Sequence, residues 1–172
     1  MMDLVVRAPR LPVIGESLLS HSFRTSPGGK GGNQAIAAAR LGASVTMIGQ
    51  VGADRFGEIL RERLEAEGVD TRFVSVDPEL GTGVAVPIVL DSGENAILAV
   101  PQANLALSSL LIERARDVIS SAGMLLVQFE VNMDATLAAM RLAEAARVPI
   151  LLNPAPVAPY PPGTLELASV IV

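Results

Sequence analysis

Residues 27–35, Pro27-Gly28-Gly29-Lys30-Gly31-Gly32-Asn33-Gln34-Ala35, place four glycines around a lysine and lead into an alanine-rich segment. Glycine lets the backbone approach a ligand closely, and the first amides of a helix point outward from its end. The stretch is not a Walker A phosphate loop, because glycine follows Lys30 where that motif has serine or threonine. It predicts either a loop that binds a polar or anionic ligand or a tight turn into a helix.

The alanine-rich segment begins an alternation of helical and aliphatic segments along the chain. Apolar spacing predicts helices at residues 32–41, 56–67, 110–121 and 134–146. We expect Ser108 or Ser109 to cap the third helix and Asp134 to cap the fourth. Short aliphatic runs predict buried strands at residues 45–50, 124–129, 148–152 and 169–172. The alternation predicts an α/β domain with a parallel sheet and right-handed crossovers.

Two segments, residues 11–23 and 82–100, interrupt the alternation with residues typical of strands. The second predicts a β-hairpin that turns at residues 91–94. We expect both segments to form a small accessory sheet beside the α/β domain. The proline-rich residues 153–162 predict a loop, since proline continues neither a helix nor a central strand.

Composition excludes several classes of function. The formal net charge is −5, the aromatic content is 3%, and no run of lysine or arginine occurs, so we expect no nucleic-acid partner. There is no cysteine and one histidine, His21, which argues against thiolate metal sites and Ser-His-Asp triads. Residues 1–10 lack the apolar region of a signal peptide, and no apolar run reaches about 18 residues. We therefore expect a cytoplasmic protein without a membrane partner.

The glycine-rich stretch and several later motifs closely resemble the ribokinase (PfkB-type) carbohydrate kinases. Residues 28–43 resemble the first signature of that family, and residues 48–57 resemble the segment that follows it. Residues 2–5 resemble the end of the first strand, and residues 93–95 resemble the lid hairpin. Residues 128–130 and 152–156 are similar to ribokinases in particular. The resemblance spans residues 1–172 and implies a Rossmann-type three-layer α/β sandwich, here incomplete, with a small β lid.

The resemblance also implies roles for individual residues in binding a sugar. Asp3 is expected to accept hydrogen bonds from two sugar hydroxyls, and Glu130 to contact the sugar from a strand end. Gly28 and Gly29 are expected to let backbone amides reach the sugar. Lys30 and Asn33 are the expected donors to its oxygens. The lid residues Asn95 to Ile97 are expected to close over the sugar, and the family often dimerises through this lid.

Each of these residues also has a simpler interpretation. Asp3 and Lys30 alone are typical of solvated surface positions, and Asp54 is more typical of a helix cap than of a catalytic group. Glu130 is harder to explain as a solvated surface residue. It follows a strand predicted to be buried, and burying an unpaired carboxylate is energetically costly. Gly32 stands where ribokinases usually have alanine, and Gln102 where they usually have glycine.

The family's second half has no counterpart in this chain. ATP and magnesium are implied by the resemblance, but the glycine-rich anion hole, the catalytic aspartate and the Asn/Glu motif linked to magnesium match no stretch of residues 1–172. Since phosphoryl transfer depends on those groups, we predict a sugar-binding half that is inactive alone and has no catalytic residue. The alternative is a non-catalytic sugar-binding or dimerising fragment of a split or interrupted kinase gene. Low aromatic content argues against a nucleoside kinase, and residues 153–156 favour ribose over fructose.

Overall fold

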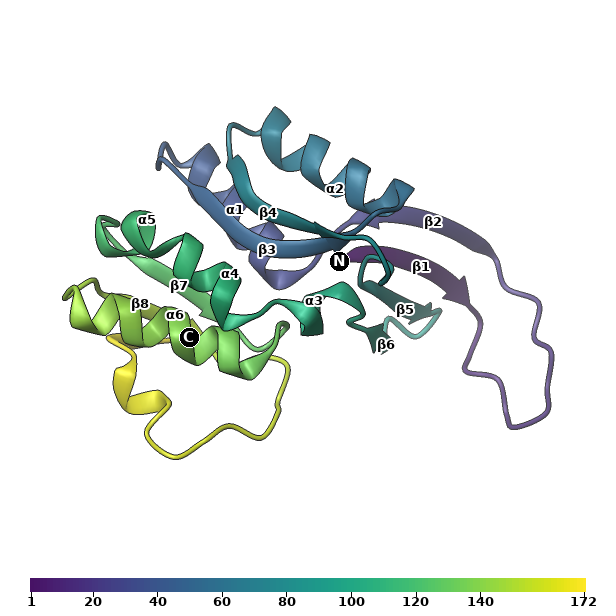
Figure 1. The fold of residues 1–172 in the computed structure, drawn as a ribbon. Coiled ribbons are helices and arrows are strands. Elements are labelled where there is room, and N and C mark those ends of the chain that lie inside the picture. The colour runs from purple at the N-terminus through teal and green to yellow at the C-terminus, as the bar shows by residue number, and fades with distance from the viewer.

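Parallel strands form the centre of the protein in the computed structural model, which describes all of residues 1–172 (Figure 1). β3 (Thr46–Gly52) pairs in parallel with β4 (Asp70–Asp77). β8 (Ile150–Asn153) pairs in parallel with β7 (Leu125–Gln128) on one side and β9 (Val170–Ile171) on the other. The predicted parallel sheet is therefore present as two pieces, and one edge each of β3 and β7 has no partner strand.

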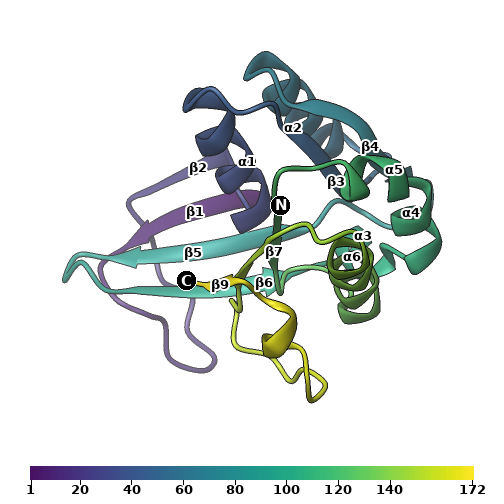
Figure 2. The same cartoon turned by 90° about the vertical axis from the view of Figure 1, so that its left-hand side faces the viewer.

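Helices cover both pieces of the parallel sheet (Figures 1 and 2). α1 contacts both β3 and β7, α2 packs on β3 and β4, and α6 packs on β7 and β8. The helices are α1 (Lys30–Arg40), α2 (Arg55–Ala66), α3 (Ala103–Ala106), α4 (Ser109–Arg114), α5 (Arg116–Ser120), α6 (Met133–Ala145) and the short 3₁₀ helix η1 (Leu165–Leu167). None of them combines the length and the apolar composition that crossing a lipid bilayer requires.

Several details of the elements differ from the sequence expectations. The expected helix at residues 110–121 is two helices, because the backbone turns at the buried Ala115. Asp134 is not the cap of α6. It already lies in the first turn, and the Asn132 side chain accepts hydrogen bonds from the amides of Asp134 and Ala135 instead. Ser108 caps α4, as one of the two expected candidates. Strand β4 was missed because charged residues interrupt its apolar pattern.

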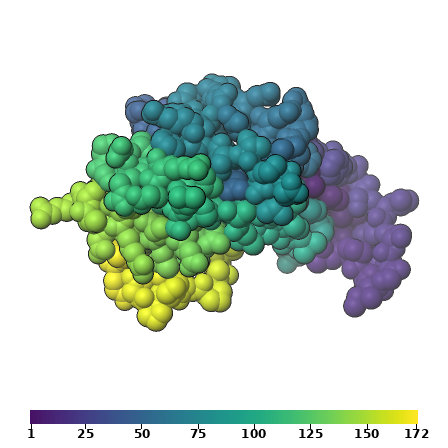
Figure 3. All heavy atoms as spheres, viewed as in Figure 1, coloured from purple at the N-terminus to yellow at the C-terminus, as the bar shows by residue number.

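A four-stranded sheet stands beside the α/β part, and its hairpin extends away from the body of the molecule (Figure 2). The strands run in the spatial order β2 (Ser22–Pro27), β1 (Met2–Ala8), β5 (Val84–Leu90) and β6 (Asn95–Val100). β5 and β6 form a hairpin within residues 82–100, as the sequence predicted. The assignment of strand structure to residues 11–23 was wrong for most of that segment. It is a loop that projects from the rest of the molecule (Figure 3). β1 takes the place in the sheet that was expected for this segment.

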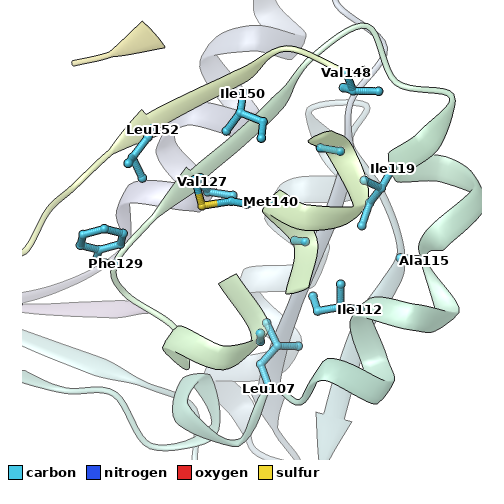
Figure 4. Close-up of a cluster of buried hydrophobic side chains, with 13 residues drawn as sticks. Leu107, Ile112, Ala115, Ile119, Val127, Phe129, Met140, Val148, Ile150 and Leu152 are labelled. Carbon is cyan, nitrogen blue, oxygen red and sulfur yellow. The ribbon is translucent and has the colours of Figure 1, made fainter. Parts of the chain in front are cut away.

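The largest apolar core lies between α6, the β7–β8 pair and helices α4 and α5 (Figure 4). Met140 of α6 is fully buried beside Val127 of β7, and Ile150 and Leu152 of β8 complete the layer. These strands carry aliphatic side chains on both faces because helices and loops cover both. The core holds the carboxyl end of β7 in place, where Gln128 is the last residue of the strand and Glu130 lies two residues further on.

Gln102 adopts a backbone conformation that favours glycine, with φ of 46° and ψ of −121°. It joins the hairpin to α3, at the position where the sequence resemblance led us to expect glycine. The Gln102 Nε2 donates to the backbone oxygen of Thr82 at 2.9 Å. The side chain thus ties the two ends of the hairpin segment together, which offsets part of the backbone strain.

Asp54 connects helix α2 to the base of the hairpin, in agreement with its interpretation as a helix cap. Its carboxylate accepts from the Gly57 amide at 2.9 Å, and from the Thr82 amide and hydroxyl at 2.7 Å each. Burial alone would raise the pKa of Asp54, but these hydrogen bonds outweigh it and hold the pKa below the ordinary value of 3.8. The carboxylate therefore stabilises the folded state above that pH, and this contribution is lost as the pH falls toward the lowered pKa.

We expect Asp54→Ala to lower the free energy of unfolding by about 2 kcal/mol at pH 7, since it removes a helix cap and leaves Thr82 without an acceptor. Urea unfolding followed by circular dichroism measures the change. Asp117→Ala is the matched control, because the Asp117 carboxylate accepts no hydrogen bond and only its backbone oxygen does, from Ser121. Equal stability of the two variants would contradict the connecting role.

Candidate functional site

Three chain segments far apart in the sequence meet at the carboxyl end of β7. They are the start of β1, the glycine turn before α1 and the residues after β7. The Glu130 Oε2 accepts a hydrogen bond from the backbone amide of Lys30 at 2.6 Å. A side chain at Gly28 would collide with the Asp3 carboxylate, so Asp3 lies directly against the turn. The structure therefore brings together Asp3, Gly28, Lys30 and Glu130 from the candidates that the sequence identified.

The glycines of the turn are required by close packing. Gly29 has a φ of 83°, which favours glycine, and a Cβ there would lie 2.8 Å from the backbone nitrogen of Met1. Gly28 is buried, and its amide donates to the Met1 oxygen at 3.0 Å. The turn thus holds its backbone against the start of β1, and the first amide of α1, that of Lys30, donates to the Glu130 carboxylate.

Two carboxylates and two amines share this site. The Lys30 Nζ lies 3.5 Å from the Glu130 Oε1, and the Lys30 side chain is 40% exposed. Burial raises the pKa of Asp3, and the Glu130 charge adds to that rise, whereas the Met1 amine and Lys30 oppose it. Burial likewise lowers the pKa of the Met1 amine. A carboxylate held in such surroundings lacks part of its hydration, so it gains from the hydroxyl donors of a bound ligand.

The remaining predicted residues lie around this centre rather than in it. Asn33 is one turn into α1 and is exposed, with no side-chain hydrogen bond. Asp3 pairs with Ala85 of β5, and Ala85 pairs with Ala99 of β6, so these three side chains point to the same face of the sheet. Side chains alternate along a strand, so Ile97 and Asn95, two and four residues before Ala99, lie on that face as well. At about 3.3 Å per residue they stand about 7 and 13 Å further along the sheet. No contact joins them to Asp3.

Two further polar groups lie near the ends of β7 and β8, in motifs to which the sequence analysis gave no site role. The Gln128 Nε2 donates to the Gln34 Oε1, which connects β7 to α1. The buried Asn153 Oδ1 at the end of β8 has no hydrogen-bond partner. Gln128 and Asn153 oppose each other in the β7–β8 register, a relation that only strand pairing reveals. No group of three or more His, Cys, Asp or Glu side chains is arranged to hold a metal ion.

The fold is that of an α/β protein with polar groups gathered at the carboxyl ends of parallel strands, the place where such folds bind small molecules, beside a four-stranded sheet. A sequence model of the pfkB family carbohydrate kinases matches residues 1–172, and the chain belongs to this family. It is 39% identical over 168 residues to the ribokinase of Bacillus subtilis, and this match covers 98% of the chain and 57% of that protein. The mouse ribokinase (Mus musculus) is 40% identical over 156 residues, covering 91% of the chain and 48% of that protein.

A solved structure supports the same family and confirms the ribokinase-like fold. The Arabidopsis thaliana ribokinase, complexed with ribose and ATP, superposes with a TM-score of 0.88 at 28% identity. That match covers 99% of this chain and 56% of the other. The chain thus spans about half the length of the relatives it matches, as an incomplete form of the fold.

Two adjacent glycines in α1 give opposite expectations for an added methyl group. Gly32→Ala is expected to raise the free energy of unfolding by about 0.5 kcal/mol, because nothing lies within 4 Å of the added Cβ and alanine favours helices. Gly31→Ala is expected to lower it by about 1 kcal/mol or more, because the Cβ would meet the Gln128 Oε1 at 3.0 Å and the Met47 Cε at 3.2 Å. Thermal unfolding of the two variants measures the difference. The packing of α1 against β7 would be contradicted if both variants shifted stability in the same direction.

Proposed function

We propose that this chain carries the sugar-binding half of an ATP-dependent carbohydrate kinase, with D-ribose or a closely related sugar as its ligand. The observation that carries the proposal is the meeting of Asp3, the Gly28–Gly29 turn, Lys30 and Glu130 at one strand end. Family membership and similarity to ribokinases support the choice of a sugar.

In this proposal each group has a distinct role toward the sugar. The two oxygens of Asp3 accept hydrogen bonds from neighbouring hydroxyls, and such charge-assisted bonds are stronger than neutral ones. Backbone amides of the turn and the Lys30 ammonium donate to sugar oxygens. Glu130 holds the Lys30 amide and faces its ammonium, so it positions the donors as well as accepting from the ligand. Asn95 and Ile97 reduce access of water when the lid closes over the sugar.

We further propose that the chain alone does not transfer phosphate. ATP supplies the phosphoryl group in such a reaction, and its charge must be stabilised by a magnesium site and an anion hole. The residues present do not fit these groups. No group of acidic side chains is arranged to hold a metal ion. Sugar binding without turnover is the expected behaviour.

The first experiment is a titration of D-ribose into the 172-residue chain, followed by its unfolding midpoint. Ribose at about 100 times its dissociation constant is expected to add about 2.7 kcal/mol of stability. L-Ribose at equal concentration controls for nonspecific effects. Incubation with ribose and ATP-Mg²⁺ is expected to give no sugar phosphate. A folded chain whose unfolding midpoint does not rise with D-ribose would exclude the sugar-binding proposal. Formation of sugar phosphate would exclude the proposal that the chain alone is inactive.

A second role, dimerisation through the lid, is favoured by the apolar face of the four-stranded sheet. Phe23 and Leu98 are 64% and 65% exposed, and Val6 and Ile88 lie between them on that face. We propose a second copy of the chain as the partner that covers it, since exposed apolar surface of this kind marks interaction sites. Sedimentation of the chain and of Leu98→Lys distinguishes a dimer from a monomer. Cytoplasmic location remains a prediction.

A further inference from the structure

An open cavity of about 410 Å³ lies on the four-stranded sheet and is lined by Val5, Arg7, Ser22, Arg24 and Val89. Its volume falls within the range of small-ligand sites, about 300–1,000 Å³. Two of its five lining residues are arginines, and the other side chains are a hydroxyl and two valines. The predicted sugar contacts include none of these residues, so the cavity requires its own explanation.

Strand register shows that the two arginines point to the same side of the sheet. Arg7 opposes Ser22, and Arg24 opposes Val5, so Arg7 and Arg24 are diagonal neighbours across β1 and β2. Diagonal neighbours stand about 7–8 Å apart, within reach of long side chains. Both guanidinium groups can therefore contact one ligand group between them.

The arginine pair has no counter-charge in the structure. Eight of the 13 lysine and arginine side chains lie within 4.0 Å of a carboxylate, whereas Arg7 and Arg24 form no ion pair and no side-chain hydrogen bond. Only three other arginines likewise lack both an ion pair and a side-chain hydrogen bond, and they are Arg114, Arg141 and Arg147. Two like charges on neighbouring strands repel each other in a protein whose net charge is −5. A bound anion would convert this repulsion into attraction.

We propose that Arg7 and Arg24 form an anion subsite that binds the phosphate group of a small ligand. Guanidinium groups match phosphate oxygens in bidentate geometry, and a phosphate monoester carries about −1.5 to −2 charges near pH 7, which suits two arginines. The Ser22 hydroxyl adds a donor on the same row as Arg7. Val5 and Val89 form an apolar floor that limits competing hydration.

The subsite lies on the sugar-facing side of the sheet. Asp3, Val5 and Arg7 alternate along β1 on this face, and Arg24 stands only one row from Asp3, about 7 Å along the strand. A sugar phosphate could therefore place its ring toward Asp3 and its phosphate toward the arginines. This extension to a sugar phosphate rests on the proposed function, whereas the anion subsite itself does not.

The test uses the 172-residue chain with three probes at constant ionic strength: inorganic phosphate, D-ribose and D-ribose 5-phosphate. Isothermal titration calorimetry gives each dissociation constant. Arg7→Gln and Arg24→Gln are each expected to weaken binding of inorganic phosphate at least about tenfold, because each removes a charged donor. Arg114→Gln is the matched control, since it removes an equally unpartnered arginine elsewhere and is expected to leave phosphate binding unchanged. Arg24→Lys is expected to restore part of the affinity.

The outcomes separate the subsite from the sugar site. A sugar phosphate as ligand is supported if ribose 5-phosphate binds more tightly than phosphate and Asp3→Asn removes only that advantage. Equal affinities assign the subsite to free inorganic phosphate. Phosphate binding without ribose binding overturns the proposed sugar site and leaves the subsite standing. Absent phosphate binding, or binding that Arg7→Gln and Arg24→Gln leave as strong as Arg114→Gln does, overturns the subsite.

Discussion

Asp3→Asn is expected to weaken D-ribose binding at least about 100-fold, because it removes the charge from two hydrogen bonds that are each worth about 1.5–3 kcal/mol when charge-assisted. The substitution preserves the size of the side chain against Gly28, so the turn before α1 keeps its shape. Isothermal titration calorimetry of the variant measures the loss. Asp91→Asn controls for the change in net charge, because Asp91 lies at the far end of the hairpin, beside His21.

The same substitution is expected to act on stability in the opposite direction. The pKa of Asp3 is raised in the folded protein, so the folded state holds this proton more tightly than the unfolded state. Stability therefore falls as the pH rises from the ordinary value of 3.8 to the raised pKa, and the penalty persists at neutral pH. Asp3→Asn removes this penalty and is expected to give a slightly higher unfolding midpoint without ligand at pH 7.

Acidification supplies an independent check of this interpretation. In the proposed site, ribose binding requires the ionised Asp3 carboxylate. As the pH falls, the affinity is therefore expected to decline at a higher pH than the ordinary aspartate pKa of 3.8. In Asp3→Asn the weak residual affinity is expected to be flat over this range. A variant that retains ribose affinity, or that loses stability at neutral pH, would remove Asp3 from the site.

Met140→Ala is expected to lower the free energy of unfolding by about 2–5 kcal/mol, because it opens a cavity in the largest core. Met140 is fully buried beside Val127 and is surrounded by the layer that fixes the end of β7 (Figure 4). A loss of this size is a large part of the stability of a typical domain, about 5–15 kcal/mol. Urea unfolding followed by circular dichroism measures it.

Met140→Leu is the matched control for this change. It nearly conserves side-chain volume and is expected to cost less than about 1.5 kcal/mol. Since Glu130 lies two residues after β7, ribose binding is also expected to weaken in Met140→Ala at temperatures where the chain is partly unfolded. Equal stability of the alanine and leucine variants would show that α6 is not packed as described.

Much of the fold follows from local patterns in the sequence. The aliphatic runs that become β3, β7 and β8 are flanked by amphipathic segments, which is sufficient to predict an α/β class. Glycines at positions 28 and 29 indicate a close backbone approach, and an acidic residue two positions after β7, Glu130, predicts a ligand at a strand end. These signals act over a few residues, so periodicity and spacing reveal them.

Long-range contacts were decided only by the tertiary structure. Lys30 and Glu130 are 100 residues apart, and no local pattern predicts that Glu130 accepts the first amide of α1. The accessory sheet likewise contains β1 where residues 11–23 were expected, because β1 pairs with β2 and β5. The Asn132 cap of α6 was missed because capping depends on where the helix begins, and neighbouring polar residues compete for that position.

The sequence by itself determined the family, the α/β class and the residue types of the proposed sugar site, because each depends on short motifs whose glycine and carboxylate chemistry is local. Only the tertiary structure decided that Asp3, Lys30 and Glu130 form one site and that Arg7 and Arg24 share one cavity. The physical reason is register. Strand pairing and core packing fix which distant side chains stand beside one another, and a shift of one residue would place Asp3 on the opposite face.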